Sequence, residues 1–351
     1  MSAFDSLNME RMTPHHDLET IQGTSTLLGR NVSAHCTILM HSCIWGGAES
    51  HAVGLSKALV ERGVSTTILC LDDRTYELFA PPNANGVELR RGSWNRPVRA
   101  RGYLDWARVF RKLPRGACLF EKGTLHAGNL ALEWAARRHF SKLVTIEQLE
   151  PPPLPPRSRG RHLGGLIPGL GLWWYEMRLR GHLRSRLPSM TVAVSESVRK
   201  RLHADYGFHP GKTVTIRNGA DVTRFRPDPD ARRAFRDRWR IPQDAFVFGT
   251  ARRMTLDKGL DIAIQAFAKL PDRRDRPTPY LALVGDGPER EALVRLAESM
   301  GVADRVRFTG FSDDPASAYP AFDVFVLPSR NEALSLALVE GMACGCLPIA
   351  T

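Results

Sequence analysis

The amino-acid sequence predicts an α/β protein built from two Rossmann-like, doubly wound domains that face each other across a cleft. With 351 residues, the chain is longer than a single hydrophobic core usually supports. Hydrophobic residues make up 43% and charged residues 25% of the sequence, which is typical of a globular protein. From residue 34 onward, short apolar runs alternate with amphipathic runs, and this pattern indicates βαβ units with parallel strands.

Changes in composition divide the chain into four parts. Residues 1–33 contain no apolar run, so we expect a disordered tail there and not a secretory signal. The first α/β domain is expected at 34–218, a charged and proline-punctuated linker at 219–243, and the second α/β domain at 244–351. Because the chain ends directly after an apolar, strand-like run, we expect the second domain to be truncated at its C-terminus.

In the first domain, the apolar runs predict strands and the amphipathic runs predict helices. Strands are expected at 35–41, 65–71, 117–121, 143–147, 190–195 and 213–218, and helices at 48–62 and 130–140. Residues 151–168 are rich in proline, glycine and basic side chains, as in a loop. A helix is expected at 173–187, with Trp173, Trp174, Tyr175 and four arginines. It either lies on an anionic membrane surface or packs its rings on the sheet and turns its arginines to water.

The same alternation continues in the second domain. Strands are expected at 245–251, 280–284, 306–309, 324–327 and 347–350, and helices at 259–270, 288–300 and 336–343. In doubly wound sheets, ligands bind beside the carboxyl ends of the strands. Residues that directly follow these strands are therefore the first candidates for a site.

Charge and cysteine content restrict the classes of function. The net charge of +12, from 49 Lys and Arg against 37 Asp and Glu, implies attraction to an anionic partner. The six cysteines occur mostly in apolar runs and are expected to be reduced core residues. No apolar run is long enough to span a membrane. No GxGxxG follows either first strand, so a dinucleotide cofactor is not implied, and the dispersed basic residues predict no nucleic-acid partner.

Two cations follow the first strand of the second domain. Arg253 and Lys258 both come after that strand, and Lys258 directly precedes a predicted helix. Guanidinium and ammonium groups beside a helix N-terminus neutralise phosphate oxygens, so this is a candidate diphosphate site. A solvated basic loop is the alternative interpretation.

Two glutamates lie near the start of the helix predicted at 336–343. Glu332 is in the loop before the helix, whereas Glu340 lies one to two turns into it. Carboxylates accept hydrogen bonds from the vicinal hydroxyls of a sugar or ribose, so the pair suits a polyhydroxylated ligand. The backbone amides of Leu334, Ser335 and Leu336 are candidate donors to phosphate oxygens at the helix start.

A set of motifs runs through most of the chain. In the second domain the motifs are Arg253 with Lys258, Gly285-Asp286-Gly287-Pro288, Phe308-Thr309-Gly310, Glu332 with Glu340, and Met342-Ala343-Cys344-Gly345. Before it they are Gly46-Gly47-Ala48-Glu49, Ser195-Glu196-Ser197, and Asn218-Gly219-Ala220-Asp221 with Phe225 and Pro227. In type and order these motifs resemble glycosyltransferase family four, the group 1 glycosyltransferases. The resemblance implies the GT-B fold and a retaining enzyme.

The resemblance also implies roles for single residues. Arg253 and Lys258 would hold the donor diphosphate and compensate the charge of the leaving group. Glu340 would bind the ribose hydroxyls, and Glu332 the donor sugar or its reacting face. Gly47 would allow the N-terminal loop to close over the phosphates and the acceptor.

His126 and Arg252 complete this comparison with the family. His126, which follows a predicted strand, resembles the family's cleft histidine near the anomeric carbon, so His126 and Glu332 are the expected catalytic residues. The chain departs from the family pattern where Arg252 takes the place of a glycine. It departs again where Ala333 and Ser335 take the places of two glycines, and their Cβ atoms narrow the loop.

The resemblance implies transfer of a hexosyl unit from a nucleotide diphosphate sugar to an acceptor hydroxyl, with retention at the anomeric carbon. The basic site replaces a metal ion, so no metal and no cofactor is expected, and Asp228-Pro229-Asp230 is interpreted as a spacer. The expected acceptor is a glycan or lipid-linked glycan in surface polysaccharide or glycolipid assembly. The enzyme is expected in the cytoplasm, with peripheral contact to the inner face of the membrane. The alternatives are a sugar-nucleotide epimerase or phosphorylase of the same fold, and a non-catalytic remnant that binds a nucleotide sugar or a partner.

Overall fold

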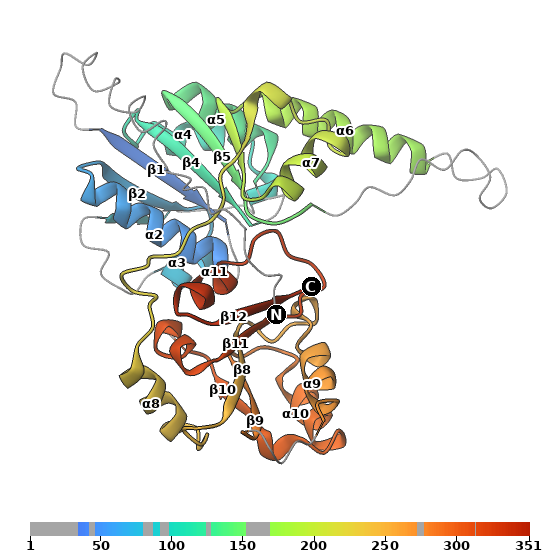
Figure 1. Cartoon of the computed structure of the whole chain (residues 1–351). Coiled ribbons are helices and arrows are strands. Elements are labelled where there is room, and N and C mark those ends of the chain that lie inside the picture. Colours follow the sequence, from blue (N-terminus) through green and yellow to red (C-terminus); the bar gives the residue numbers. More distant parts are fainter. Residues whose placement is uncertain are drawn as a thin grey trace, which may run out of the picture.

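Two parallel β-sheets, each covered by helices, form the two halves of the molecule (Figure 1). The computed structural model describes residues 34–41, 46–79, 87–91, 98–123, 128–151, 169–271, 277–312 and 314–351. Within these residues the first sheet has seven strands and the second has five, and neighbouring strands pair in parallel. This is the α/β architecture that the alternating apolar and amphipathic runs predict.

The first sheet has the strand order β3-β2-β1-β4-β5-β6-β7. Its strands are β1 His35–Met40, β2 Ser65–Cys70, β3 Val87–Arg91, β4 Ala117–Lys122, β5 Lys142–Glu147, β6 Met190–Ala193 and β7 Thr213–Thr215. The order reverses between β1 and β4, which pair from Cys36 with Ala117 onward. Such a reversal opens a crevice at the carboxyl ends of the two strands.

Helices cover both faces of the first sheet. They are α2 Gly47–Glu61, α3 Asp73–Phe79, α4 Tyr103–Phe110, α5 Leu130–His139, α6 Gly169–Arg186 and α7 Glu196–Ala204. Side chains of one strand alternate between the faces: Phe120 packs with Trp106 under α4 and α5, whereas Leu119 packs with Ile38 under α2. The apolar pattern does not predict β3, α3, α4 or α7.

Helix α6 contains most of the segment expected at 173–187. The side chains of its aromatic residues Trp173, Trp174 and Tyr175 lie outside the described residues. None of the helices in the part of the chain that the structure describes combines the length and the apolar character needed to cross a membrane.

The second sheet has the strand order β10-β9-β8-β11-β12. Its strands are β8 Phe246–Ala251, β9 Pro279–Val284, β10 Val306–Gly310, β11 Val324–Leu327 and β12 Leu347–Ala350. Its helices are α8 Pro229–Arg238, α9 Leu260–Ala268, α10 Arg290–Ser299 and α11 Leu336–Ala343. Short 3-10 helices are η1 Val98–Ala100, η2 Pro210–Lys212, η3 Leu256–Lys258, η4 Ala303–Arg305, η5 Pro315–Ser317 and η6 Tyr319–Ala321.

Helix α8 lies inside the segment 219–243 that the sequence predicts as a linker. Asp228, interpreted as part of a spacer, caps this helix, because its Oδ1 accepts hydrogen bonds from the amides of Asp230 and Ala231 at 3.0 and 2.9 Å. Phe235 of α8 packs against the core of the second sheet. This part of the expected linker therefore belongs to the second half of the molecule.

Arg236 fixes α8 to the second sheet. Its side chain is fully buried, and its guanidinium donates hydrogen bonds to the carbonyl oxygens of Gln243 at 2.7 Å and Ala321 at 2.9 Å. A further bond joins it to the Asp323 carboxylate at 3.1 Å. A buried guanidinium is tolerated here because backbone carbonyls and a carboxylate accept its hydrogens.

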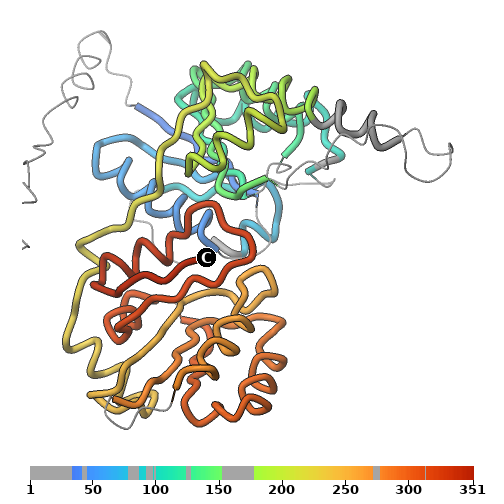
Figure 2. Tube along the Cα trace, turned by 45° about the vertical axis from the view of Figure 1, so that its right-hand side comes forward, coloured from blue at the N-terminus to red at the C-terminus, as the bar shows by residue number. Residues whose placement is uncertain are grey.

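The carboxyl edges of the two sheets face each other. Figure 2 shows the chain passing from the upper to the lower half along one side of the molecule, after β7 and before α8. Asn218, which follows β7, donates a hydrogen bond from Nδ2 to the carbonyl oxygen of Leu334 at 3.4 Å. Since Leu334 follows β11, this bond joins the carboxyl end of one sheet to that of the other.

Candidate active site

Most of the predicted donor residues lie at the carboxyl edge of the second sheet. The strand order reverses between β8 and β11, so the segments after these strands lie side by side. Arg252 and Arg253 follow β8, and Ser329 and Glu332 follow β11. Lys258 ends η3, and Gly259 alone separates it from α9.

Two glycines allow these segments to approach each other closely. Gly259 has a φ of +65°, and a Cβ atom on it would lie 1.9 Å from the carbonyl oxygen of Pro328. A Cβ atom on Gly285 would lie 1.9 Å from the carbonyl oxygen of Arg252. No side chain fits at such distances, so glycine is required where the ends of β8, β9 and β11 meet.

Glu332 is surrounded by two cations and a hydroxyl group. The Arg252 guanidinium donates hydrogen bonds to the Glu332 carboxylate and to the Ser329 hydroxyl, and the Arg252 side chain is only 5% exposed. The Ser329 hydroxyl lies 3.4 Å and the Lys258 ammonium 3.5 Å from Oε2 of Glu332. The structure thus brings Lys258 and Glu332 into one cluster, and Arg252 completes it.

Arg253 extends toward the first half of the molecule. A Cβ atom on Gly46, directly before α2, would lie 3.4 Å from Nη2 of Arg253. The Nε atom of Arg253 is buried and has no hydrogen-bond partner among the described residues. A buried N–H donor without an acceptor is costly unless a ligand accepts from it, and phosphate oxygens suit this role.

The amides of Leu334, Ser335 and Leu336 lie at the N-terminus of α11. The Ser335 hydroxyl caps this helix by accepting a hydrogen bond from the Leu338 amide at 3.4 Å. Within the described residues, the amides of 334, 335 and 336 donate to no group of the protein. Leu336 Cδ1 lies 3.6 Å from the position that a Cβ atom on Gly47 would take. The N-termini of α2 and α11 therefore meet across the cleft, and both favour an anion.

Glu340 occupies a separate position on α11. The Tyr319 hydroxyl donates a hydrogen bond to Oε2 of Glu340 at 2.8 Å. Burial raises the pKa of the Glu340 carboxyl group, and the bond from Tyr319 opposes part of this rise. Burial, together with the charge of Glu340, raises the pKa of Tyr319. Among the contacts of the described residues, none joins Glu340 to Glu332, so the two glutamates can serve different parts of one ligand.

A chain of hydrogen bonds runs along the carboxyl edge of the first sheet and ends in the loop before α11. His51 Nδ1 lies 2.7 Å from Oε1 of Glu121, and Gln148 Nε2 donates to the other oxygen of this carboxylate at 3.0 Å. Asn218 Nδ2 donates to Oε1 of Gln148 at 3.2 Å and to the Leu334 carbonyl. Because a carboxylate only accepts, Glu121 fixes the orientation of the Gln148 amide, which in turn accepts from Asn218.

The sequence pattern does not predict Glu121, Gln148 or Tyr319 as site residues. Glu121 and Gln148 have a local signal, since each is a polar residue at the end of an apolar strand. Tyr319 has none, because its partner Glu340 is 21 residues away and only the fold brings the two together. Burial lowers the pKa of His51, but the hydrogen bond and charge of Glu121 outweigh burial and raise it.

His126, the second expected catalytic residue, lies outside the described residues. Among the residues that the structure does describe, no three His, Cys, Asp or Glu side chains form a group that could hold a metal ion. The part of the candidate site that the structure describes consists of the side chains around Arg253, Lys258, Glu332 and Glu340.

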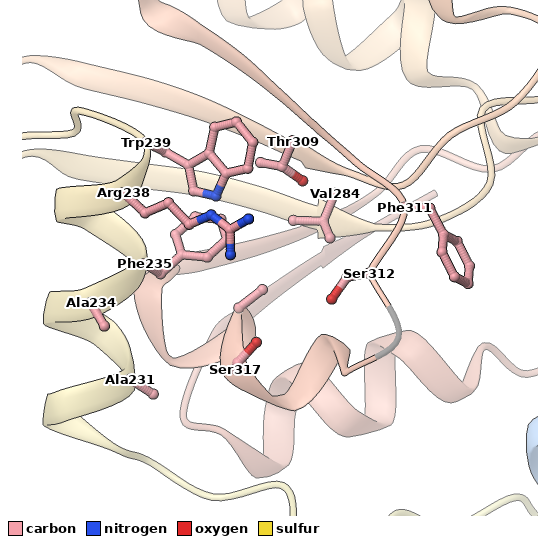
Figure 3. Close-up of a pocket in the computed structure, with 11 residues that line it drawn as sticks. Ala231, Ala234, Phe235, Arg238, Trp239, Val284, Thr309, Phe311, Ser312 and Ser317 are labelled. Carbon is pink, nitrogen blue, oxygen red and sulfur yellow. The ribbon is translucent and has the colours of Figure 1, made fainter. Parts of the chain in front are cut away.

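A pocket of about 200 Å³ lies between α8 and the second sheet (Figure 3). Phe235 and Arg238 of α8, together with Trp239 directly after this helix, line one side, and Val284 and Thr309 at the ends of β9 and β10 line the other. None of the predicted donor residues contributes to its lining. This pocket is therefore distinct from the cluster around Glu332.

Two protein-family models match the chain. "Glycosyltransferase Family 4" matches residues 45–224, and "Glycosyl transferases group 1" matches residues 231–351. The lipopolysaccharide core biosynthesis glycosyltransferase LpsD of Rhizobium meliloti is 31% identical over 302 residues, which are 86% of this chain and 73% of that protein. A GDP-mannose-dependent alpha-(1-6)-phosphatidylinositol monomannoside mannosyltransferase of Mycolicibacterium smegmatis is 37% identical over 162 residues, 43% of this chain and 41% of that protein.

Solved structures share the arrangement of the two sheets. Anabaena Alr3699/HepE, in complex with UDP and glucose, superposes with a TM-score of 0.68 at 22% identity, over 90% of this chain and 80% of that one. WaaG, a glycosyltransferase involved in lipopolysaccharide biosynthesis, superposes with a TM-score of 0.61 at 15% identity, over 89% of this chain and 80% of that one. The family models, the relatives and the fold agree, and the chain belongs to glycosyltransferase family 4, the group 1 glycosyltransferases with the GT-B fold.

Proposed function

We propose that this glycosyltransferase moves a hexosyl unit from a nucleotide diphosphate sugar to a hydroxyl of a glycan or lipid-linked acceptor, with retention at the anomeric carbon. One observation supports the proposal above all: the Nε atom of Arg253 is buried without a hydrogen-bond partner among the described residues, and its guanidinium lies beside the N-terminus of α2, where that of α11 also lies. A cation and two helix N-termini at one point favour a multiply charged anion, as a diphosphate is.

Different residues of the site bind different parts of the donor. Arg253, Lys258 and the amides at the start of α11 take the diphosphate. Glu340 accepts hydrogen bonds from the ribose hydroxyls, which suits a carboxylate whose hydrogen-bond partner among the described residues is the Tyr319 hydroxyl. Glu332, together with Arg252, faces the sugar. The Glu332 carboxylate is next to the phosphate subsite, because it lies beside the Lys258 ammonium.

The proposed reaction needs only the donor and the acceptor as reactants. The acceptor oxygen forms a bond to the anomeric carbon, and the bond from this carbon to the diphosphate oxygen breaks. The proton of the acceptor hydroxyl passes to the leaving diphosphate. Arg253, Lys258 and the helix N-termini stabilise the negative charge that develops on the leaving group. His126 contacts the sugar beside the anomeric carbon, a role that rests on the family resemblance.

We propose surface polysaccharide or glycolipid assembly at the cytoplasmic face of the membrane as the setting. LpsD is named for lipopolysaccharide core biosynthesis, and the mycobacterial relative for a phosphatidylinositol monomannoside. The net charge of +12 favours contact with an anionic lipid or glycan.

Calorimetric titration of the chain with UDP, GDP, UDP-glucose and GDP-mannose tests the donor site. We expect one nucleotide and its sugar to bind, and Lys258→Ala and Glu340→Ala to weaken binding by about 10-fold or more, because each removes a charge-assisted contact. Lys269→Ala, an exposed lysine at the end of α9, is the matched control and should bind like the wild type. A folded protein that binds none of the four ligands contradicts the proposal.

The configuration of the transferred sugar tests retention. Slow hydrolysis of the bound donor should release the sugar first as the anomer present in the donor, which NMR detects before mutarotation. Release of the opposite anomer contradicts retention. Conversion of the donor sugar into an epimer without release would indicate a sugar-nucleotide epimerase, and binding without turnover on any acceptor tested would favour a non-catalytic remnant.

A further inference from the structure

The pocket between α8 and the second sheet places a guanidinium beside two aromatic rings, and the donor site uses none of these groups (Figure 3). We propose that this pocket binds a small aromatic carboxylate, separately from the nucleotide sugar. The proposal is independent of the proposed function, because the residues assigned to the donor do not line the pocket. We call it the α8 pocket, and the side chains that would contact the ligand are Phe235, Arg238, Trp239, Val284, Ser312 and Ser317.

One wall of the α8 pocket is aromatic. Phe235 and Trp239 are four residues apart, so both rings lie on one side of the end of α8, and their centroids are 6.3 Å apart. The Phe235 ring also contacts that of Phe322, a buried core residue, with a centroid distance of 5.9 Å. Val284 lies on the opposite side (Figure 3). Apolar walls on both sides favour the flat body of an aromatic ring.

Arg238 supplies the charge of the α8 pocket. Figure 3 shows its side chain extending from α8 toward Val284. The guanidinium lies over the Trp239 ring, with Cζ 5.7 Å from the centroid. The other three arginines of α8 each form an ion pair with an aspartate. The Arg238 side chain forms neither an ion pair nor a hydrogen bond in the part of the chain that the structure describes. Its planar donor fork can therefore bind a carboxylate through two hydrogen bonds.

Hydroxyl groups complete the polar side of the α8 pocket. The Ser317 hydroxyl donates a hydrogen bond to the carbonyl oxygen of Asp314 at 2.8 Å, so its oxygen is left to accept from a ligand. The Ser312 hydroxyl has no hydrogen bond to the described residues and can donate to a carboxylate oxygen. Of the lining residues that the structure describes, none is acidic. A carboxylate in the pocket therefore meets a cation and a hydroxyl donor, and no like charge from this lining.

The volume of the α8 pocket limits the ligand to about one ring. The pocket has a volume of about 200 Å³. An apolar cavity of about 150 Å³ in another protein binds benzene, whereas sites for drug-sized ligands have about 300–1,000 Å³. One aromatic ring with a carboxylate therefore fits, and a whole nucleoside diphosphate does not.

The α8 pocket is a neighbour of the donor site but shares none of the donor residues. Ser317 and Ala318 line the pocket and directly precede Tyr319. The Tyr319 hydroxyl is instead bonded to Glu340, and neither Tyr319 nor Glu340 lines the pocket. A nucleotide and an aromatic carboxylate can therefore be bound at the same time.

Calorimetric titration with benzoate tests the proposal. We expect the full chain to bind benzoate with a Kd of about 0.1–1 mM. Benzamide has the same shape without the charge and should bind about 10-fold more weakly. Arg238→Gln should weaken benzoate binding by about 10-fold and remove the preference over benzamide. Ala234→Phe should abolish binding of both, because Ala234 lines the pocket from an exposed position of α8 and a phenyl group there fills the space. The matched control is Arg233→Gln on the same helix. Arg233 is 68% exposed and does not line the pocket, so its replacement should leave binding unchanged.

Saturating UDP or GDP should leave the affinity for benzoate within about 3-fold, because the two sites share no residue. Loss of benzoate binding in the presence of a nucleotide would place the pocket in the donor site and overturn the proposal. Three other results would overturn it: no binding of benzoate by the folded wild type, equal binding of benzoate and benzamide, and wild-type binding by Arg238→Gln. Thermal unfolding shows whether each variant is folded. Nucleotide titration of the same variants measures the donor site, so failure of the α8 pocket is separated from failure of the proposed function.

Discussion

Glu340 lies against Tyr319, and burial raises the pKa of its carboxyl group above the ordinary value of 4.5. A carboxyl group with a higher pKa in the folded state binds more protons when folded than when unfolded. As pH rises from about 4.5 through the raised pKa, the free energy of unfolding therefore falls. At neutral pH, the ionised Glu340 is held in place by the rest of the fold and destabilises the ligand-free protein.

We therefore expect Glu340→Gln to raise the melting temperature at pH 7 and to change it little at about pH 4, where the wild-type group is protonated. Affinity for the nucleotide should fall by about 10-fold or more, because the ribose loses a charged acceptor. Thermal unfolding at the two pH values and calorimetric titration measure both effects. A variant that melts below the wild type at pH 7 contradicts the burial argument.

Arg252 determines how Glu332 is oriented, since its guanidinium joins the Glu332 carboxylate to Ser329. In Arg252→Ala, we expect the affinity for the free nucleotide to stay within about 2-fold of the wild type. The additional affinity contributed by the sugar should fall by about 5-fold or more, because Glu332 loses its orientation. Comparison of UDP with UDP-glucose, or of GDP with GDP-mannose, measures this difference. Equal weakening of the nucleotide and its sugar would place Arg252 in the phosphate subsite instead.

At the scale of elements, a buried charge cluster joins β4, β5, α5 and α6. The Lys122 ammonium lies 2.9 Å from the Glu133 carboxylate and 3.0 Å from that of Glu147, and all three side chains are at most 2% exposed. Arg184 of α6 adds a second cation beside Glu133. Burial raises the pKa of Glu147, and the charges of Lys122 and Arg184 oppose this rise. The cluster links the first sheet to α5 and α6 through charges that stabilise the fold only as a set.

Lys122→Met should destabilise the protein by about 3–5 kcal/mol, because it leaves Glu147 buried without its hydrogen-bonded cation. Urea unfolding measures the change. Lys142→Met is the control, since Lys142 is exposed at the start of β5, and it should stay within about 0.5 kcal/mol of the wild type. Similar small effects for both variants would mean that the cluster is not stabilising.

The sequence predicts some helices, strands and site residues but not others, for physical reasons. The apolar runs predict β8 and β11, and because ligands bind at strand ends, the same runs point to Arg253, Lys258 and Glu332. The apolar pattern does not predict helix α8, because the fully buried residue of this helix is Arg236, which is not apolar. The pattern also does not predict the hydrogen bond that Gln148 donates to Glu121 or the one that it accepts from Asn218, because these bonds join residues 27 and 70 positions apart.

At the scale of the whole molecule, Asn218 connects the two sheets through Gln148 and the Leu334 carbonyl. Asn218→Ala should weaken nucleotide binding by about 2–10-fold, the range expected for a lost hydrogen bond, because the loop before α11 is no longer tied to the first half. The free energy of unfolding should change by less than about 1 kcal/mol.

Asn129→Ala gives the opposite pattern and serves as a control. Its side chain caps α5 by accepting from the Leu132 amide at 2.7 Å, so the variant should lose about 1 kcal/mol of stability with unchanged nucleotide affinity. Titration and urea unfolding of both variants separate the two roles. If Asn218→Ala binds nucleotide like the wild type, the connection between the sheets does not position the donor loop.

The anchoring of α8 by Arg236 has a consequence for motion. The crossing segment begins at Asn218, which is bonded to the first half, and ends at Asp228, which caps a helix fixed to the second sheet. Phe225, which lies between these two points, packs on Tyr319 in the core of the second sheet. Residues 219–224 are therefore the segment that can change its backbone angles without disturbing this packing or the bonds described above. A rotation of the two halves toward each other would therefore be concentrated in a hinge of a few residues. The two halves would move as rigid bodies and close around the donor site.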